Sequence, residues 1–409
     1  MATRALILVE GHSGMGLSYI LAAQQLGLYP ITLSADPAQY CYIAAEKHEA
    51  VRVDTDNLDA LVQQCSQISE TYEIAGIIGF SRADESACVM AGKLCRHFVL
   101  PGPNLEAIEQ CCDKYTQRQL LAASGVPIPE YRLATNAAEV GDSAEEIGLP
   151  VIIKPAAGSG SVGVRLCRTA RELAEHTNYI LGGQHRWGAA PRILVEEFAN
   201  GGPAYGVDTM GDAVVGISTL HCGPPPNFVY RDATYPAALN NEEHERSIID
   251  ISLSSLRALG LGWGPAGIEV QWTEGGPVII EVNPRLHGSP TPQMVDLAYG
   301  IDLITAHIKL AIGEELDLRK RHSQTAAARF LVADRDGTLD WIGGESEAAA
   351  LPGVAEVKFY VQPKTPIVRK GDYRDCLGHV IAASSSLPRA EAILQRAVDL
   401  INWSITPQG

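Results

Sequence analysis

Residues 266–283 restrict the fold more than any other segment, because they are typical of an antiparallel hairpin that carries acids on one face. The apolar runs AGIEVQW (266–272) and VIIEVN (278–283) flank the turn TEGGP. With the turn centred on Gly275, Glu269 lies directly opposite Glu281, and Asn283 follows on the same face. The residues predicted for the opposite, buried face are Ile268, Val270, Ile280 and Val282.

The paired acids predict a cation site. Two carboxylates directly opposite each other repel unless a cation lies between them. The side-chain oxygen of Asn283 completes a set of hard oxygen ligands, which suits Mg²⁺ and also admits Mn²⁺, with phosphates and water as the usual further ligands. The alternative is a solvated hairpin with two acids by chance. Arg285, in the Asn-Pro-Arg that follows, favours the metal site.

A glycine-rich loop is predicted at residues 151–164, which read VIIKPAAGSGSVGV. The familiar phosphate loop, GxxxxGK[ST], has its lysine after the glycines. Here Lys154 comes first, at the end of an apolar strand, so this is a loop of another kind. Lys114, within a helix expected at 104–124, reads in isolation as an ordinary surface lysine.

The first hundred residues alternate apolar strands with helical stretches, which predicts a parallel α/β sheet. The turn from Gly11 to Gly16 has the spacing GxxGxG, and Asp36 follows about twenty residues later, as a ribose-binding acid would. A dinucleotide site, and hence a nicotinamide oxidoreductase, is one interpretation. A tight turn of a degenerate Rossmann-like domain, facing a substrate, is the interpretation we favour.

Composition limits the classes of partner. A chain of 409 residues predicts two or three domains. Its net charge of −16 argues against nucleic acid or an anionic membrane as the main partner. We expect no membrane span, since no apolar run is long enough. The nine cysteines include no CxxC pair, and without an export signal they indicate reduced thiols in a cytoplasmic protein.

Taken in order, the lysine and glycine loop, an apolar strand ending in acids (LVEEF, 194–198) and the two-carboxylate hairpin resemble the ATP-grasp superfamily. The resemblance covers residues 114–313, and it is strongest to the L-amino-acid ligases and related carboxylate–amine ligases. It implies a mixed α/β and α+β fold in three parts. These are a Rossmann-like domain (1–110), an ATP-grasp domain (111–313, with subdomains at about 114–195 and 196–313) and a mixed C-terminal domain (314–409).

The resemblance also implies roles for individual residues. Lys114 and Lys154 would contact ATP phosphates, and Arg285 would steady the transferred phosphoryl group and the acyl phosphate. The phosphates would be covered by the loop of Gly158, Ser159, Gly160, Ser161, Val162 and Gly163. Adenine would be read at the hinge of Glu196, Glu197, Phe198 and Ala199, mostly through backbone groups. The Mg²⁺ ligands would be Glu269, Glu281 and Asn283.

One position departs from the family pattern. Many members have a ribose-binding glutamate where this chain has Ala204, so we expect ribose contacts from elsewhere, with Asp208 as the candidate. Residues 221–240 are typical of a loop that closes over a ligand. Candidate substrate contacts are His287, Arg231, Asp232 and Arg329, the last from the C-terminal domain.

The function that the resemblance implies is ATP-dependent ligation of a carboxylate to an amine through an acyl phosphate. An amino acid is expected as one substrate, and a homodimer is a family-level expectation. Two alternatives stay open at this point. One is a carboxylase that acts through carboxyphosphate, and the other is a regulatory protein that binds ATP without turnover.

Overall fold

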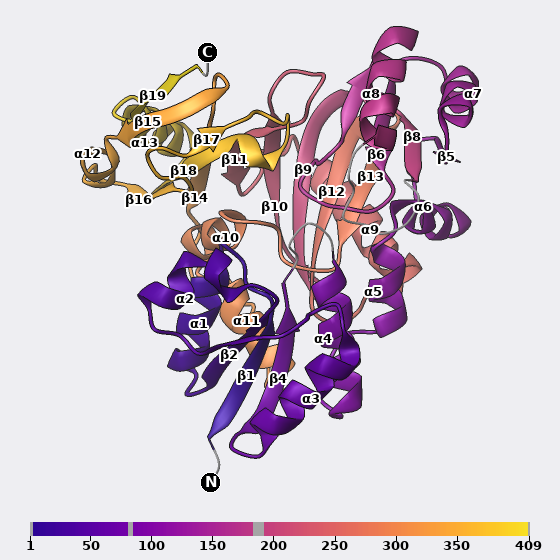
Figure 1. Cartoon of the computed structure of the whole chain (residues 1–409). Coiled ribbons are helices and arrows are strands. Elements are labelled where there is room, and N and C mark those ends of the chain that lie inside the picture. Colours follow the sequence, from indigo (N-terminus) through magenta and orange to yellow (C-terminus); the bar gives the residue numbers. More distant parts are fainter. Residues whose placement is uncertain (1–2, 81–84, 183–191, 408–409) are drawn as a thin grey trace.

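The computed structural model describes residues 3–80, 85–182 and 192–407, which form three lobes (Figure 1). The N-terminal lobe is a four-stranded parallel sheet in the order β3 (Ala50–Arg52), β2 (Tyr29–Ser34), β1 (Arg4–Val9) and β4 (Glu73–Gly79). Helices α1 (Gly16–Gln25), α3 (Leu58–Ser69) and α4 (Ser86–His97) accompany these strands, and α2 (Cys41–Ala45) follows β2. The central residues of β1 and β4 are apolar and buried because a parallel sheet is covered on both faces. The predicted α/β character of this region is confirmed.

The helix expected at 104–124 is two helices, so that prediction is wrong in detail. Helix α5 (Leu105–Cys111) ends and α6 (Lys114–Ala123) begins within three residues. Asp113 is extended (φ −115°, ψ 112°), and its carboxylate accepts a hydrogen bond from the Thr116 amide, which starts the second helix. This N-cap places Lys114 at the first position of α6.

The glycine loop belongs to a small antiparallel sheet in the order β5 (Tyr131–Ala134), β8 (Ile193–Glu197), β6 (Val151–Pro155) and β7 (Arg165–Cys167). Helices α7 (Ala137–Ile147) and α8 (Ala170–Gly182) pack on it. This lobe lies at the upper right in Figure 1. The loop itself connects β6 to β7 and faces the rest of the molecule.

The third sheet has eight strands and is antiparallel throughout. Its order is β13 (Gly276–Asn283), β12 (Pro265–Thr273), β9 (Gly201–Met210), β10 (Ala213–Cys222), β11 (Tyr230–Tyr235), β14 (Thr325–Val332), β18 (Cys376–Ser384) and β16 (Val354–Phe359). The sheet continues across the predicted domain boundary at residue 313, because β11 pairs with β14. The expected ATP-grasp and C-terminal regions therefore share one sheet.

Helices cover both faces of the large sheet. Helix α9 (Glu242–Ala258) packs behind β12 and β13, and α10 (Thr291–Tyr299) packs on β14. Helix α13 (Leu387–Val398) lies on β14 and β18 from the other side, next to α12 (Glu345–Ala349). A second small sheet of β17 (Pro366–Ile367), β15 (Gly337–Gly343) and β19 (Asn402–Thr406) completes the C-terminal lobe.

The predicted hairpin forms, and its register is confirmed at the acids: Glu269 pairs with Glu281, and Gly267 pairs with Asn283. A bulge follows Glu269, so that Val270 pairs with Ile279. The residue on the buried face is consequently Ile279, which is fully buried, and the prediction of Ile280 for that face is wrong.

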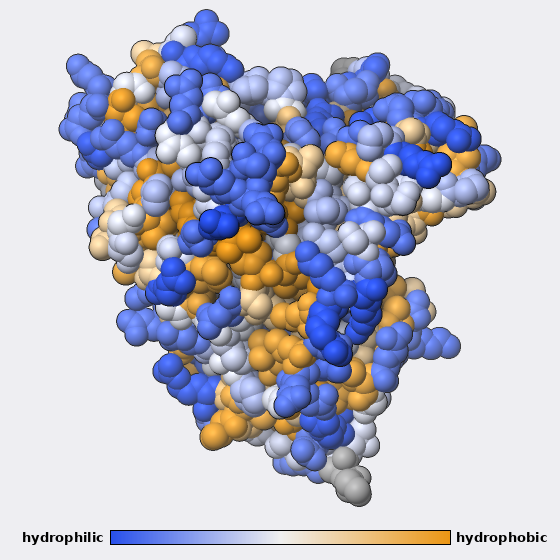
Figure 2. All heavy atoms as spheres, turned by 180° about the vertical axis from the view of Figure 1, so that it is seen from behind, coloured by the Kyte–Doolittle hydropathy of each residue, from blue (hydrophilic) through white to orange (hydrophobic). Residues whose placement is uncertain are grey.

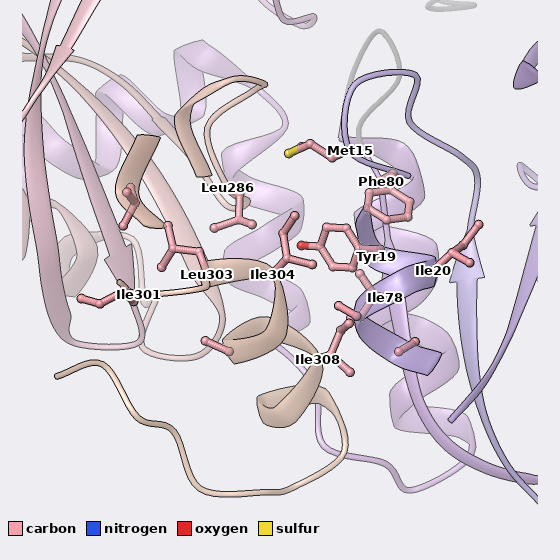
Figure 3. Packing of buried hydrophobic residues seen from close by; sticks show 14 of the residues in the cluster. Met15, Tyr19, Ile20, Ile78, Phe80, Leu286, Ile301, Leu303, Ile304 and Ile308 are labelled. Carbon is pink, nitrogen blue, oxygen red and sulfur yellow. The ribbon is translucent and has the colours of Figure 1, made fainter. Parts of the chain in front are cut away.

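The N-terminal lobe is fixed to the hairpin side by a shared apolar core (Figure 3). Tyr19 of α1 packs edge-on against Phe80, with ring centroids 4.7 Å apart. Its hydroxyl is 2.8 Å from Nδ1 of His307, in α11 (Leu303–Ala311). Leu286, which follows the hairpin, belongs to the same cluster. The loop that carries Arg285 is thus held by the N-terminal lobe.

The outer surface is unevenly apolar. Seen from behind, apolar residues gather in the middle of the molecule and extend downward, whereas the upper lobes are mostly hydrophilic (Figure 2). Among the helices of the described ranges, none combines the length and apolar character needed to span a bilayer.

Candidate active site

The buried side chains of helix α6 lie on one face of the helix. Lys114, Gln117, Arg118 and Leu121 are buried and follow the spacing i, i+3, i+4, i+7, which places them on one side of the helix. The Gln117 amide donates to the Val282 carbonyl (2.8 Å) and accepts from the Val282 amide (2.9 Å). This exchange pins α6 along β13, the edge strand of the large sheet, and places Lys114 next to the hairpin acid Glu281.

Lys114 links the two sheets. Its Nζ lies 2.9 Å from Oε1 of Glu281 and also donates to the carbonyl of Gly158 in the glycine loop. The lysine that looked like a surface residue is therefore buried between the predicted metal ligands and the predicted phosphate loop. The structure brings all three features together.

Lys154 is buried in an ion-pair triad that sequence analysis missed. Nζ of Lys154 is 2.5 Å from Oε2 of Glu196, and Nε of Arg118 is 2.6 Å from Oε1 of the same carboxylate. Arg118 is 1% exposed and also donates to the Ile280 carbonyl. Burial lowers the pKa of Lys154, while Glu196 beside it works to raise it. Burial would raise the pKa of Glu196, but Arg118 and Lys154 hold it below its usual value.

The triad determines which groups of the hinge, residues 196–199, could contact a nucleotide. Because both oxygens of Glu196 are occupied by cations, its side chain orients Lys154, and backbone groups remain the means by which 196–199 could read adenine. A signal for Arg118 was present in the sequence, since it lies four residues after Lys114 on the same helix face.

The paired acids are held by different partners. Glu269 accepts a hydrogen bond from the Tyr230 hydroxyl (2.9 Å), whereas Glu281 faces Lys114. Burial and the charge of Glu281 raise the pKa of Glu269. Burial also acts on Glu281, but Lys114 and Lys154 lower its pKa.

This environment fits a divalent cation. An uncompensated pair of buried carboxylates is unfavourable, and a cation between them would remove that cost. Within the described ranges, no three His, Cys, Asp or Glu side chains converge on one point. A metal here would therefore depend on Asn283 and on oxygens of a phosphate ligand, as expected for Mg²⁺.

Arg285 is held by a residue of the N-terminal lobe. Its Nε donates to Oε1 of Glu85 (2.9 Å), and its two other nitrogens donate to the Leu286 carbonyl (3.0 Å) and the Asn283 side chain (3.3 Å). Glu85 lies at the start of α4 and is 5% exposed. Sequence analysis missed Glu85, because nothing local connects it with a residue 200 positions away.

His287 and Asp208 form a buried pair, with Nδ1 of His287 2.9 Å from Oδ1 of Asp208. Burial would lower the pKa of His287, but Asp208 raises it. Nε2 of His287 and Oδ2 of Asp208 are buried and have no partner among the described residues. Asp208 lies four residues from Ala204, about 13 Å along the strand. In this structure Asp208 orients His287, and its contact with ribose stays a prediction.

The predicted substrate contacts Asp232 and Arg329 lie on the wrong face of the sheet. They pair with each other across β11 and β14, with a 2.6 Å ion pair, and Arg329 also donates to Gln395 of α13. Their neighbours on these strands, Ala233 and Ala328, point to the opposite face.

Strand register identifies that opposite face as the face of the acids. Glu269 pairs with Gly206, and Gly206 pairs with Ser218. Leu220 lies two residues after Ser218, on the same face of the strand, and it pairs with Ala233. Asp232 and Arg329 therefore lie on the sheet face away from the acids, which does not support their predicted substrate roles. Arg231 is exposed, at the bulge between β10 and β11. That bulge turns Tyr230 onto the face of the acids.

The glycine loop is closed against other segments. Gly158, Gly160, Ser161 and Gly163 have positive φ, and a Cβ on Gly160 would lie 2.5 Å from the Tyr373 ring. The Tyr373 amide donates to the Gly160 carbonyl (3.3 Å), and Ser161 donates to the carbonyl of Phe228 (3.4 Å). The C-terminal region and residues 223–229 thus both contact the phosphate loop, whereas residues 230–235 of the predicted closing loop form strand β11 instead.

The Gly11–Gly16 turn offers no room for a dinucleotide. The ring of Tyr40 would lie 2.6 Å from a Cβ on Gly11, and the Tyr42 hydroxyl would lie 2.1 Å from one on Gly16. Asp36, the candidate ribose ligand, is exposed and pairs with Arg52 (2.7 Å). The tight-turn interpretation agrees with this packing, and the dinucleotide interpretation does not.

Comparisons with known proteins agree with this architecture. The family described as carbamoyl-phosphate synthase L chain, ATP binding domain, matches residues 113–319, and the L-amino acid ligase C-terminal domain 2 matches residues 329–406. An uncharacterized protein, y4rH, of Sinorhizobium fredii (strain NBRC 101917 / NGR234) is 58% identical over 404 residues, which cover 99% of this chain and 84% of that protein.

More distant relatives have established names. Carnosine synthase 1 of Mus musculus is 27% identical over 335 residues, covering 75% of this chain and 39% of that protein. The crystal structure of an L-amino acid ligase from Bacillus licheniformis superimposes with a TM-score of 0.83 at 21% identity, over the full length of both chains. The chain belongs to the ATP-grasp ligases.

Proposed function

We propose that this protein is an ATP-dependent carboxylate–amine ligase that forms an amide or peptide bond, with an amino acid as one substrate. The observation that carries the proposal is the gathering of three cations at the hairpin acid Glu281: Lys114 forms an ion pair with it, and the charges of Lys154 and Arg285 also act on it. Phosphoryl transfer depends on positioning and charge neutralisation rather than on covalent chemistry by the protein, and this set supplies both.

ATP and Mg²⁺ fit the residues present. Glu269, Glu281 and Asn283 would hold the metal, and Lys114, Lys154 and the amides of 158–163 would hold the phosphates. When bound, Mg-ATP supplies the phosphoryl group that converts the substrate carboxylate into an acyl phosphate. Attack by the amine on that carbonyl carbon then forms the amide and releases inorganic phosphate.

The chain's own residues orient the reactants and exclude water. Glu85 fixes the guanidinium of Arg285 next to Asn283, where it can neutralise the phosphoryl oxygens. The glycine loop and the segment at 223–229 cover the site, which matters because acyl phosphates hydrolyse readily. The L-amino acid ligase domain matched at 329–406 supports an amino-acid substrate.

The test is release of ADP and phosphate from Mg-ATP against a pairwise panel of amino acids and small carboxylates, with mass spectrometry of each positive mixture. We expect release that needs two partners and a product at their summed mass minus water. Release that needs bicarbonate alone would indicate a carboxylase instead. Bound ATP without turnover across the panel would indicate a regulatory protein.

A further inference from the structure

Three segments that are far apart in the sequence meet at the glycine loop. They are the loop itself, residues 223–229, and residues 370–375, which we call the C-terminal turn. The amide of Leu166, on β7, donates to the Pro226 carbonyl (2.9 Å). Because residues 223–229 join β10 to β11, this hydrogen bond ties the small lobe to the large sheet.

The C-terminal turn is built on two buried aspartates, Asp372 (1% exposed) and Asp375 (5% exposed). The Asp375 carboxylate accepts hydrogen bonds from the amides of Lys370 (2.6 Å) and Gly371 (2.9 Å). The Asp372 carboxylate accepts from the Arg374 amide (3.0 Å) and from the Arg374 guanidinium (2.8 and 2.6 Å). Both carboxylates thus satisfy the backbone of the turn. The turn keeps its shape without the glycine loop, and β18 begins directly after it.

Tyr373 projects from this turn to the glycine loop. Its side chain is 50% exposed, so it adds little to the core of the C-terminal region. Its amide donates to the Gly160 carbonyl (3.3 Å), and its Cδ1 would lie 2.5 Å from a Cβ on Gly160. Gly160 has a φ of 68°, where glycine is favoured over residues with a side chain. The ring therefore packs directly on the backbone of the loop.

The C-terminal turn and residues 223–229 also contact each other. Side-chain atoms of Asn227 occupy the space that a side chain on Gly371 would need. The ring of Phe228 lies 6.3 Å from that of Phe198, in the hinge. The three segments therefore form a closed set of contacts, and the loop can lift from the site only if this set opens.

We infer that the C-terminal turn is a latch for the glycine loop, and that Tyr373 is the positioning residue that keeps this loop over the phosphates during turnover. Tyr373 acts through the backbone of Gly160. The effect on nucleotide release requires only that the protein binds ATP, and the effect on product formation rests on the proposed function.

A loop that is held in place protects the acyl phosphate from water. If water reaches this intermediate, it attacks the acyl carbon in place of the amine. The bond from that carbon to the phosphate oxygen breaks, and the products are the carboxylate, phosphate and a proton. ATP is then consumed without amide formation. The latch therefore determines how many ADP molecules are released for each amide formed.

The first experiment measures release of a fluorescent, non-hydrolysable ATP analogue by stopped flow. We expect Tyr373→Ala to release the analogue about three- to tenfold faster, the effect expected from the loss of one aromatic contact. Tyr373→Phe keeps the ring and the amide and should release it at the wild-type rate. Tyr29→Ala is the matched control, because Tyr29 is an exposed tyrosine of the N-terminal lobe. Unchanged release in Tyr373→Ala would overturn the inference.

The second experiment combines Tyr373→Ala with Gly160→Ala. A methyl group at residue 160 would collide with the Tyr373 ring and displace the loop, so Gly160→Ala alone should already open the latch. We expect the double variant to release the analogue no faster than Gly160→Ala does. If the two effects multiplied, Tyr373 would not act through the loop, and the inference would be wrong.

The third experiment counts ADP and amide with the substrates found in the panel. We expect one ADP for each amide in the wild type and about three to ten in Tyr373→Ala. Equal ratios in the two proteins would overturn the role of the latch in product formation. Wild-type protein that binds the analogue and forms no amide would refute the ligase proposal alone, and the release rates would still decide whether the latch exists.

Discussion

The nucleotide side and the substrate side of this molecule are built differently. On the nucleotide side, three short segments that each have a recognisable local pattern supply the chemistry: helix α6, the glycine loop and one hairpin, held together by Lys114, Lys154 and Glu196. On the substrate side, single residues from distant regions meet: Arg285 donates to Glu85, and Lys358 donates to the Gly14 carbonyl. The first side is set by local patterns, and the second by how the lobes pack.

The difference shows where stability and specificity reside. The nucleotide side buries its charges in closed ion-pair networks, which are costly to open. On the substrate side, charges are held by contacts between lobes, such as the ion pair of Arg285 with Glu85. We therefore expect substitutions on the nucleotide side to affect stability, and substitutions on the substrate side to affect specificity.

The largest effect is expected from Arg285→Ala, the residue that joins both sides. Loss of the guanidinium removes charge neutralisation at the phosphoryl group, and comparable arginines contribute about 10³-fold or more to kcat. The measurement is ADP release with the substrates found in the panel. Wild-type turnover in this variant would refute the role assigned to Arg285.

Glu281→Gln should impair the nucleotide side by about 10²-fold or more, through weaker Mg²⁺ binding, because Glu281 is the acid of lowered pKa in the pair. A Mg²⁺ titration of ATPase activity should show half-saturation moved to higher metal concentration. Glu274→Gln, in the hairpin turn, is an exposed control that should leave the titration unchanged. An identical Mg²⁺ dependence in Glu281→Gln would exclude it as a metal ligand.

Glu196→Gln should destabilise the fold by about 3–5 kcal/mol, since it leaves Arg118 and Lys154 buried without their counter-charge. Urea unfolding provides the measurement. Glu197→Gln is the matched control, because the neighbouring side chain is exposed and should cost little. Equal stability of the two variants would show that the triad is not a structural element of the nucleotide side.

The smallest effect concerns pH and the Asp208–His287 pair. The pKa of His287 is raised in the folded state by Asp208, so the stabilisation is fully present below the unfolded pKa of about 6.5 and is lost as pH rises through the folded pKa. Urea unfolding of wild type and His287→Gln should differ more at pH 5.5 than at pH 9. A difference that grows with pH would contradict the ion pair.

Sequence analysis could anticipate the nucleotide side because periodicity specifies it. A period of two placed Glu269 opposite Glu281, and the glycine spacing marked the phosphate loop. It failed at Ile280, where a bulge after Glu269 shifted the register, and at 104–124, where the Asp113 cap divided the helix. Neither feature leaves a periodic signal.

The substrate side could not be anticipated in the same way. Asp232 and Arg329 looked suitable as polar strand residues, but the face of a strand in an eight-stranded sheet depends on every pairing between it and the acids. Glu85 and Arg285 come from regions with no shared local pattern. Their proximity results from the apolar core that fixes the N-terminal lobe to the loop after β13 (Figure 3).

The central claim is that the two sides cooperate to activate a carboxylate as an acyl phosphate. The most direct test labels the carboxylate substrate with heavy oxygen and follows the label by mass spectrometry of the phosphate released. The account predicts that one labelled oxygen per turnover appears in phosphate, because the carboxylate oxygen leaves with the phosphoryl group. Unlabelled phosphate, formed together with the amide, would contradict it.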